Sequence, residues 1–230
     1  MGKWVRGYCL ILALTLLAAH WANRAVTVFT ENTPPQRKYT IIVDPGHGGV
    51  DGGATSCTGV LESQFNLEIG LRLRDMLQFL GHKTVMTRTE DVSIYTKGET
   101  IAQKKVSDLK ERVRIVNDAG NGILVSIHQN NFSESRYSGA QVFYAATEGS
   151  QALAGELQKE LVRCLNPGSR RQEKRSSSIY LMEHIQCPGV LIECGFLSNP
   201  EEEARLRKPE YQKDLSAVIA CTLSENLANT

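Results

Sequence analysis

The stretch that decides the fold is IIVDPGHGG, at residues 41–49. It continues a run of apolar residues that starts at residue 39 and has the length of a strand, and it leads into a glycine-rich loop that extends to residue 59. A strand with consecutive apolar residues is buried on both faces, which is typical of parallel sheets. The glycines allow the backbone to turn sharply behind the strand and allow a bulky substrate to come close. We therefore predict a central strand, 39–43, that ends at a functional loop.

Outward from this strand, apolar runs of strand length alternate with amphipathic stretches of helical length. This alternation predicts a single layered α/β/α domain with a largely parallel mixed sheet. The expected elements are helix 63–80, strand 84–87, a polar surface loop 88–107, a helix capped by Asp108 and running to Asp118, strands 123–127 and 140–145, helix 150–165, a basic polar segment 166–177, strand 190–192, and helices near 200–207 and 211–227.

The N-terminus has the pattern of an export signal. Lys3 and Arg6 precede an uncharged run, 7–23, with an apolar centre. No clean cleavage site with small residues follows, so a cleaved signal peptide and an uncleaved signal-anchor both fit, and a buried core helix fits less well. We predict a signal peptide or signal-anchor at 1–23, a linker at 24–38 and a catalytic domain at 39–230. Either form exports the domain, so we expect an extracytoplasmic protein, secreted or membrane-anchored, with membrane contact at its N-terminus.

Composition excludes several classes of function. Lys and Arg number 26, Asp and Glu number 25, the net charge is +1, and aromatic residues make up only 7%. Neither a basic field nor a base-stacking surface is indicated, so no nucleic-acid partner is expected. The six cysteines contain no C-x-x-C pair, which excludes a zinc ribbon. Outside the N-terminal segment we interpret them mostly as small buried apolar residues.

Residues suited to metal binding or acid–base chemistry follow several of the predicted elements. His47, His128 and Glu193 each come directly after an apolar strand, and Glu62 stands just before the first long helix. In parallel sheets the carboxyl ends of the strands share one edge, and ligands bind there. Two imidazoles and one carboxylate form a common catalytic zinc set with an open position for water. A second carboxylate beside the metal is the usual general base.

Each of these residues also has a purely structural interpretation. A single His after a strand is more often a hydrogen-bonded structural residue, and Asp44 and Glu193 could be paired loop carboxylates. Glu62 could be an acid that complements a helix dipole, and His184 is an alternative ligand. The glycine-rich loop lacks the spacing of a phosphate-binding loop. Only the joint placement of the four residues favours a zinc site.

Four ordered motifs make the pattern specific. They are residues 41–49, the GVLE segment at 59–62, SIHQN at 126–130 and LIECGFLSN at 191–199. Together they closely resemble the zinc-dependent N-acetylmuramoyl-L-alanine amidases of the amidase-3 type, over about residues 39–227. The resemblance implies an enzyme that hydrolyses the amide between the lactyl group of N-acetylmuramic acid and L-alanine in peptidoglycan.

Carried over by position, the resemblance implies the roles of the site residues. His47, Glu62 and His128 match the ligands of one zinc ion, and Glu193 matches the catalytic carboxylate. Zinc would polarise the scissile carbonyl, while Glu193 would take a proton from water and return it to the leaving nitrogen. No covalent intermediate is required.

A narrower resemblance concerns the subtype. Residues 139–144 and the lack of a wall-binding repeat look most like the sporulation amidases of the CwlD type. This implies a substrate in the spore cortex, a step towards muramic-δ-lactam, a role connected with germination, and a location in the forespore intermembrane space. An accessory or activating wall or spore protein is an expected partner, beside the peptidoglycan substrate.

Substrate contacts are expected from Arg170, Arg171 and Asn130. An Arg can hold a free carboxylate of a peptide stem through two hydrogen bonds, although a solvated basic loop explains residues 170–175 equally well. Two other functions compete with the amidase. One is another zinc peptidase of the cell wall, and the other is a wall-binding protein with a vestigial metal site.

Overall fold

We describe the protein from a computed structural model, which covers residue 2, residue 15, residues 17–18 and residues 38–228. The predicted signal or anchor segment 1–23 and the linker 24–38 lie almost entirely outside these residues. Among the described residues, no helix has the length and apolar character needed to cross a membrane.

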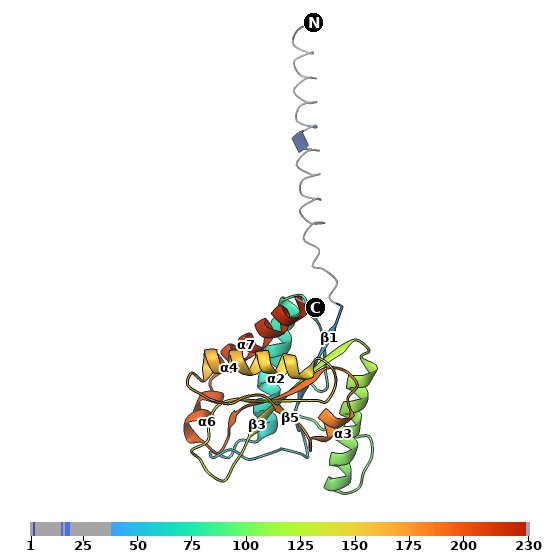
Figure 1. The fold of residues 1–230 in the computed structure, drawn as a ribbon. Coiled ribbons are helices and arrows are strands. Elements are labelled where there is room, and N and C mark those ends of the chain that lie inside the picture. Colours follow the sequence, from blue (N-terminus) through green and yellow to red (C-terminus); the bar gives the residue numbers. More distant parts are fainter. Residues whose placement is uncertain (1, 3–14, 16, 19–37, 229–230) are drawn as a thin grey trace. The chain divides into compact units, whose positions relative to one another are not determined.

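A six-stranded sheet forms the centre of the domain, in the order β2-β1-β3-β6-β4-β5 (Figure 1). Strands β2, β1, β3 and β6 run parallel, whereas β4 is antiparallel to β6 and pairs in parallel with β5. The prediction of a largely parallel mixed sheet is therefore confirmed. The strand bounds are Thr40–Pro45 (β1), Lys83–Met86 (β2), Gly122–Asn130 (β3), Gln141–Tyr144 (β4), Lys174–Arg175 (β5) and Gly189–Phe196 (β6).

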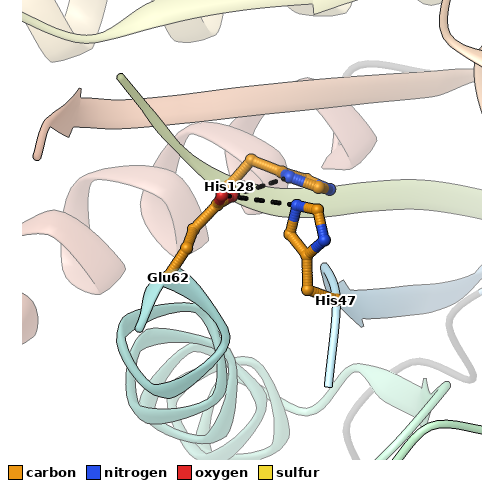
Figure 2. Close-up of side chains that lie close together, drawn as sticks. All are labelled: His47, Glu62 and His128. Carbon is orange, nitrogen blue, oxygen red and sulfur yellow. Dashed lines mark hydrogen bonds and ion pairs between the residues drawn. The ribbon is translucent and has the colours of Figure 1, made fainter. Parts of the chain in front are cut away.

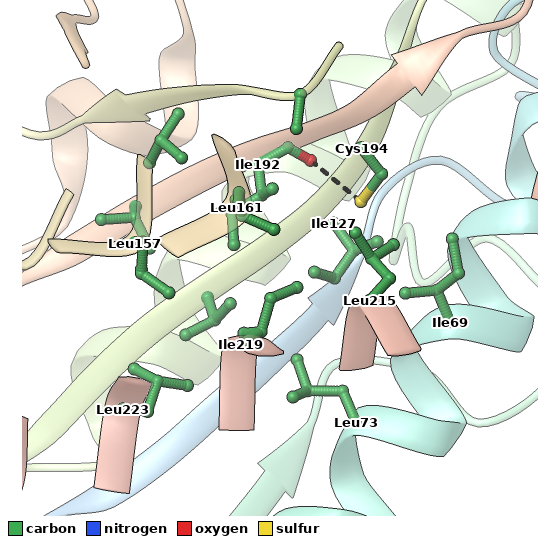
Figure 3. Close-up of a cluster of buried hydrophobic side chains, with 14 of the residues drawn as sticks. Ile69, Leu73, Ile127, Leu157, Leu161, Ile192, Cys194, Leu215, Ile219 and Leu223 are labelled. Carbon is green, nitrogen blue, oxygen red and sulfur yellow. Dashed lines mark hydrogen bonds between the residues drawn. The ribbon is translucent and has the colours of Figure 1, made fainter. Parts of the chain in front are cut away.

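Helices cover both faces of the sheet, because alternate residues of the buried strands point to opposite sides. Ile41 and Val43 belong to the larger core, under α2, α4 and α7 (Figure 3), and Ile42 belongs to a second core, on the side of α3 and α5. The predicted α/β/α layering is confirmed. The helix bounds are Glu62–Phe79 (α2), Ile101–Asp118 (α3), Ser150–Leu165 (α4), Tyr180–His184 (α5), Pro200–Leu206 (α6) and Pro209–Ala228 (α7).

The predicted loop 88–107 is wrong in its second half, where α3 begins at Ile101. Thr100 caps this helix in a capping box with Gln103, in which each side chain bonds the backbone of the other residue. Asp108, expected as the cap, lies inside the helix. Its carboxylate accepts hydrogen bonds from the backbone N–H of Ile94 and from Arg112, so a tertiary contact rather than capping explains this acid.

Other differences come from burial that the sequence does not show. His82, expected at a surface turn, is buried, and its Nε2 lies 2.7 Å from Ser224 Oγ. Strand β6 continues through Phe196, so Glu193 lies within the strand and not behind it. The cysteine prediction is only partly right. Cys187 and Cys194 are buried, but three others are exposed: Cys57, Cys164 and Cys221.

Candidate active site

Three predicted metal ligands meet at the carboxyl edge of the sheet. Glu62 is the first residue of α2, His47 lies just after β1, and His128 lies near the end of β3 (Figure 2). Glu62 Oε1 is 3.0 Å from His128 Nδ1, and Glu62 Oε2 is 3.3 Å from His47 Nε2. One donor atom of each residue lies within 4.8 Å of the other two. Donor atoms this close to one another could bind one shared metal ion.

Two glycines, which have no side chain, make this close approach possible. A Cβ on Gly46 would lie 2.1 Å from His128 Nε2, and a Cβ on Gly53 would lie 2.6 Å from Glu62 Oε2. His47 itself has a φ of 60°, in the left-handed region that side chains rarely adopt. The loop therefore needs outside support to hold His47 in this conformation.

Arg112 supplies part of that support from α3. Its guanidinium donates to Asp44 Oδ1 at 2.5 Å, to the carbonyl of Pro45 at 2.9 Å and to the carbonyl of His47 at 2.6 Å. Asp44 is fully buried and also accepts hydrogen bonds from Thr87 and Ser126. For Asp44, these contacts fit the structural interpretation that the sequence left open. Its partner is a buried cation that fixes the end of β1.

Arg88 also supports this loop. It donates to the carbonyls of Pro45 and Gly46 at 2.9 and 3.0 Å, and to the carbonyl of Ser63 at 2.8 Å. Gly46 precedes His47, and Ser63 follows Glu62. One buried guanidinium thus joins the backbone segments that carry two of the three predicted ligands.

Further hydrogen bonds orient the ligand side chains. Asp51 Oδ2 lies 3.0 Å from His47 Nδ1, and Lys105 lies 2.7 Å from the other oxygen of Asp51. The backbone N–H groups of Ala54 and Gln129 donate to Glu62. Such outer partners fix the tautomer and the orientation of metal-binding side chains. We did not predict Asp51 from the sequence, although its position four residues after His47 was a usable signal.

The charges of the cluster stabilise one another. Burial lowers the pKa of His47, but hydrogen bonds with Asp51 and Glu62 and their negative charges outweigh it, and the pKa rises to about 9. Burial raises the pKa of Glu62, but the hydrogen bonds and charges of His128 and His47 bring it well below its ordinary value. The pocket thus holds Glu62 as a carboxylate, the form that binds a metal.

Glu193 lies beside the cluster but is not one of its three members. It is directly opposite His128 in the register between β3 and β6. Burial raises the pKa of Glu193, the positive charge of His128 lowers it, and the negative charge of Glu62 raises it. The result is a pKa of about 7. Its Oε2 atom is buried and has no hydrogen-bond partner among the described residues. A carboxyl group with a raised pKa and an unused oxygen is suited to proton transfer.

The other candidate residues are placed differently. Arg171 donates to the carbonyl of Ser138 at 3.0 Å, and its guanidinium lies 4.9 Å from the ring centre of Phe196. Arg170 is exposed. Asn130 ends β3, and its carbonyl accepts from Leu197. The alternative ligand His184 is exposed on α5, where its Nδ1 lies 2.8 Å from the carbonyl of Tyr180, and it is not part of the cluster.

Comparison with known proteins decides the family. Residues 41–225 match the family described as N-acetylmuramoyl-L-alanine amidase. The chain belongs to this amidase family. It is 40% identical over 181 residues to the germination-specific N-acetylmuramoyl-L-alanine amidase of Bacillus subtilis (strain 168), covering 78% of this chain and 76% of the relative.

Solved structures of amidases have the same fold. The CwlD amidase from Clostridioides difficile, solved in complex with the GerS lipoprotein, has a TM-score of 0.80 and 37% identity, covering 83% of this chain and 99% of that one. An N-acetylmuramoyl-L-alanine amidase from Clostridium difficile 630 has a TM-score of 0.74 and 30% identity, covering 84% and 99%. The predictions of an N-acetylmuramoyl-L-alanine amidase and of similarity to the CwlD type are confirmed.

Proposed function

We propose that this amidase is zinc-dependent and that His47, Glu62 and His128 hold one zinc ion. The observation that carries the proposal is the convergence of two imidazoles and one ionised carboxylate within 4.8 Å. This donor set is common in catalytic zinc sites, which keep one position open. The glycines that make room for the ligands, and the unpartnered oxygen of Glu193 beside them, fit the same site.

The residues of the site then have separate roles in the reaction. When bound, zinc supplies Lewis-acid chemistry that polarises a carbonyl and acidifies water. Asp51 holds His47 through Nδ1, which leaves Nε2 for the metal. Glu193 accepts a proton from water and returns it to the L-alanine nitrogen as the amide breaks. Its raised pKa favours both steps, because the group can exist in either protonation state near neutral pH.

The names of the relatives support a narrower proposal for the substrate and the setting. We extend the proposal to cleavage of the amide between the lactyl group and L-alanine in spore cortex peptidoglycan, as a step towards muramic-δ-lactam. Segment 1–23 would export the domain as a signal peptide or signal-anchor, towards the forespore intermembrane space. Because the similar CwlD amidase was solved with a lipoprotein, we also propose an accessory lipoprotein partner. Arg170 is the candidate for gripping a stem carboxylate, since Arg171 is engaged within the protein.

The deciding experiment combines metal analysis of the purified full chain with mass spectrometry of digested cortex peptidoglycan. We expect one zinc ion per chain and release of L-alanine-terminated peptides. Cleavage between D-amino acids or within the stem would indicate a cell-wall peptidase instead. Zinc-free protein that binds peptidoglycan without cleaving it would indicate a vestigial site.

A further inference from the structure

An aromatic platform lies at the carboxyl ends of β3 and β6. It consists of Phe132, Tyr137 and Phe196. The rings of Phe132 and Tyr137 meet edge to face with centres 5.1 Å apart, and those of Tyr137 and Phe196 stack at 6.3 Å. Phe196 is buried, but Phe132 is 50% exposed. An apolar ring left half in solvent beside a catalytic site is a candidate contact for substrate.

Contacts within the protein hold the platform in place. The backbone N–H of Phe132 donates to Ser198 Oγ at 3.1 Å, and Asn199 Nδ2 donates to the carbonyl of Tyr137 at 3.2 Å. The guanidiniums of Arg136 and Arg171 lie 5.3 Å from the Tyr137 ring centre and 4.9 Å from the Phe196 ring centre. Binding to a surface that is already ordered avoids much of the entropic cost of ordering it.

The platform is close to the reacting centre along two strands. His128 lies opposite Glu193, and Asn130 lies opposite Phe196 in the same pair of strands. Phe132 follows His128 by four residues, so the Cα atoms of the two residues are at most ~14 Å apart. A substrate held at the proposed metal site therefore has its neighbouring groups within reach of this ring.

We propose that Phe132, supported by Tyr137, binds a pyranose ring of the peptidoglycan glycan strand. This inference rests on the proposed function, in which the scissile amide hangs from a sugar through a short lactyl group. One face of a pyranose carries mainly C–H groups, and a flat aromatic ring is complementary to such a face. The charged peptide stem would gain little from an apolar ring. The sugar would therefore bind at the side of the site that is formed by β6 and the loop 131–139.

The test measures binding to glycan strands from which the peptides have been removed. It uses the full chain, zinc-loaded, and catalysis plays no part because these strands have no amide bond to L-alanine. We expect Phe132→Ala to weaken binding by about tenfold, as expected for the loss of one ring contact, and Phe132→Trp to retain it. Phe79→Ala is the matched control, because Phe79 is 90% exposed at the far end of α2, ~26 Å from Glu62.

Two outcomes would overturn the proposal. One is unchanged affinity in Phe132→Ala, or no saturable binding of glycan even with Phe132 present. The other is a Phe132→Ala variant that binds glycan normally but binds a lipoprotein partner more weakly than the unmutated chain does. That result would make the platform a contact for a protein. Thermal unfolding and zinc content of each variant show whether it is folded and loaded. Failure of the proposed function would appear separately, as the absence of amide cleavage by the unmutated protein.

Discussion

Replacing Arg88 with Lys tests whether a buried guanidinium holds the proposed zinc ligands in place. Arg88 donates to four backbone carbonyls, those of Pro45, Gly46, Ser63 and Glu90, at 2.8–3.0 Å. Lys keeps the positive charge, but its single ammonium cannot reproduce a planar fork of donors. An ammonium has three N–H donors, so we expect at least one of these four charge-assisted hydrogen bonds to be lost.

The magnitude follows from that count. A hydrogen bond to a charged group contributes about 1.5–3 kcal/mol, so the loss of one such bond in Arg88→Lys should lower the free energy of unfolding by roughly 1.5–3 kcal/mol. The same change loosens Gly46 relative to Ser63, and hence His47 relative to Glu62. Loss of an outer partner of a metal site typically weakens metal binding by about 10–100-fold, and we expect a loss in this range for zinc.

Two measurements separate these effects. Urea unfolding of the metal-free protein gives the stability change, and competition with a chelator gives the zinc affinity of the folded protein. The spectrum of the cobalt-substituted protein reports ligand geometry, which a merely structural role would leave unchanged. Arg74→Lys is the control, because Arg74 forms an ion pair at the surface. Zinc affinity and cobalt spectrum identical to those of the unmutated protein would refute the bracing argument.

Three further predictions concern the site and its support. His128→Ala should abolish both zinc retention and hydrolysis, since it removes a proposed ligand; a variant with full zinc and normal activity, measured by metal analysis and muropeptide release, would exclude His128. Glu193→Gln should keep zinc and lose ~10²–10⁴-fold in rate, because the amide cannot accept the proton; loss of zinc in this variant would make Glu193 a ligand. Burial raises the pKa of Asp44, but the charge of Arg112 and two hydroxyl hydrogen bonds outweigh it and lower the pKa to about 2, from 3.8. Asp44 therefore stabilises the fold above pH 3.8, and this contribution, about 2 kcal/mol, is lost as the pH falls towards 2. In denaturant unfolding across this pH range, the free energy of unfolding should fall less steeply with decreasing pH for Asp44→Asn than for the unmutated protein. Identical pH dependence of the two proteins would contradict the assignment.

The sequence by itself determined the layered architecture and the set of residues at the site. Hydrophobic runs of strand length, separated by amphipathic helices, predicted the alternation, and helix 150–165 matches α4 in the structure. His47, Glu62, His128 and Glu193 could be grouped before any coordinates because parallel strands end at a common edge. These signals are local in the chain and depend only on side-chain period and element order.

Only the tertiary structure decided how that site is held. Arg88 and Arg112 are, in sequence, indistinguishable from the charged residues of a solvated surface. Their importance comes from burial against backbone carbonyls that are distant in the sequence, such as the carbonyl of His47, which is 65 residues from Arg112. Residue type fixes the number of hydrogen-bond donors, but the packed fold chooses which acceptors they meet. For the same reason the sequence could not show that Arg171 supports Phe196 or that Phe132 is left exposed beside the site.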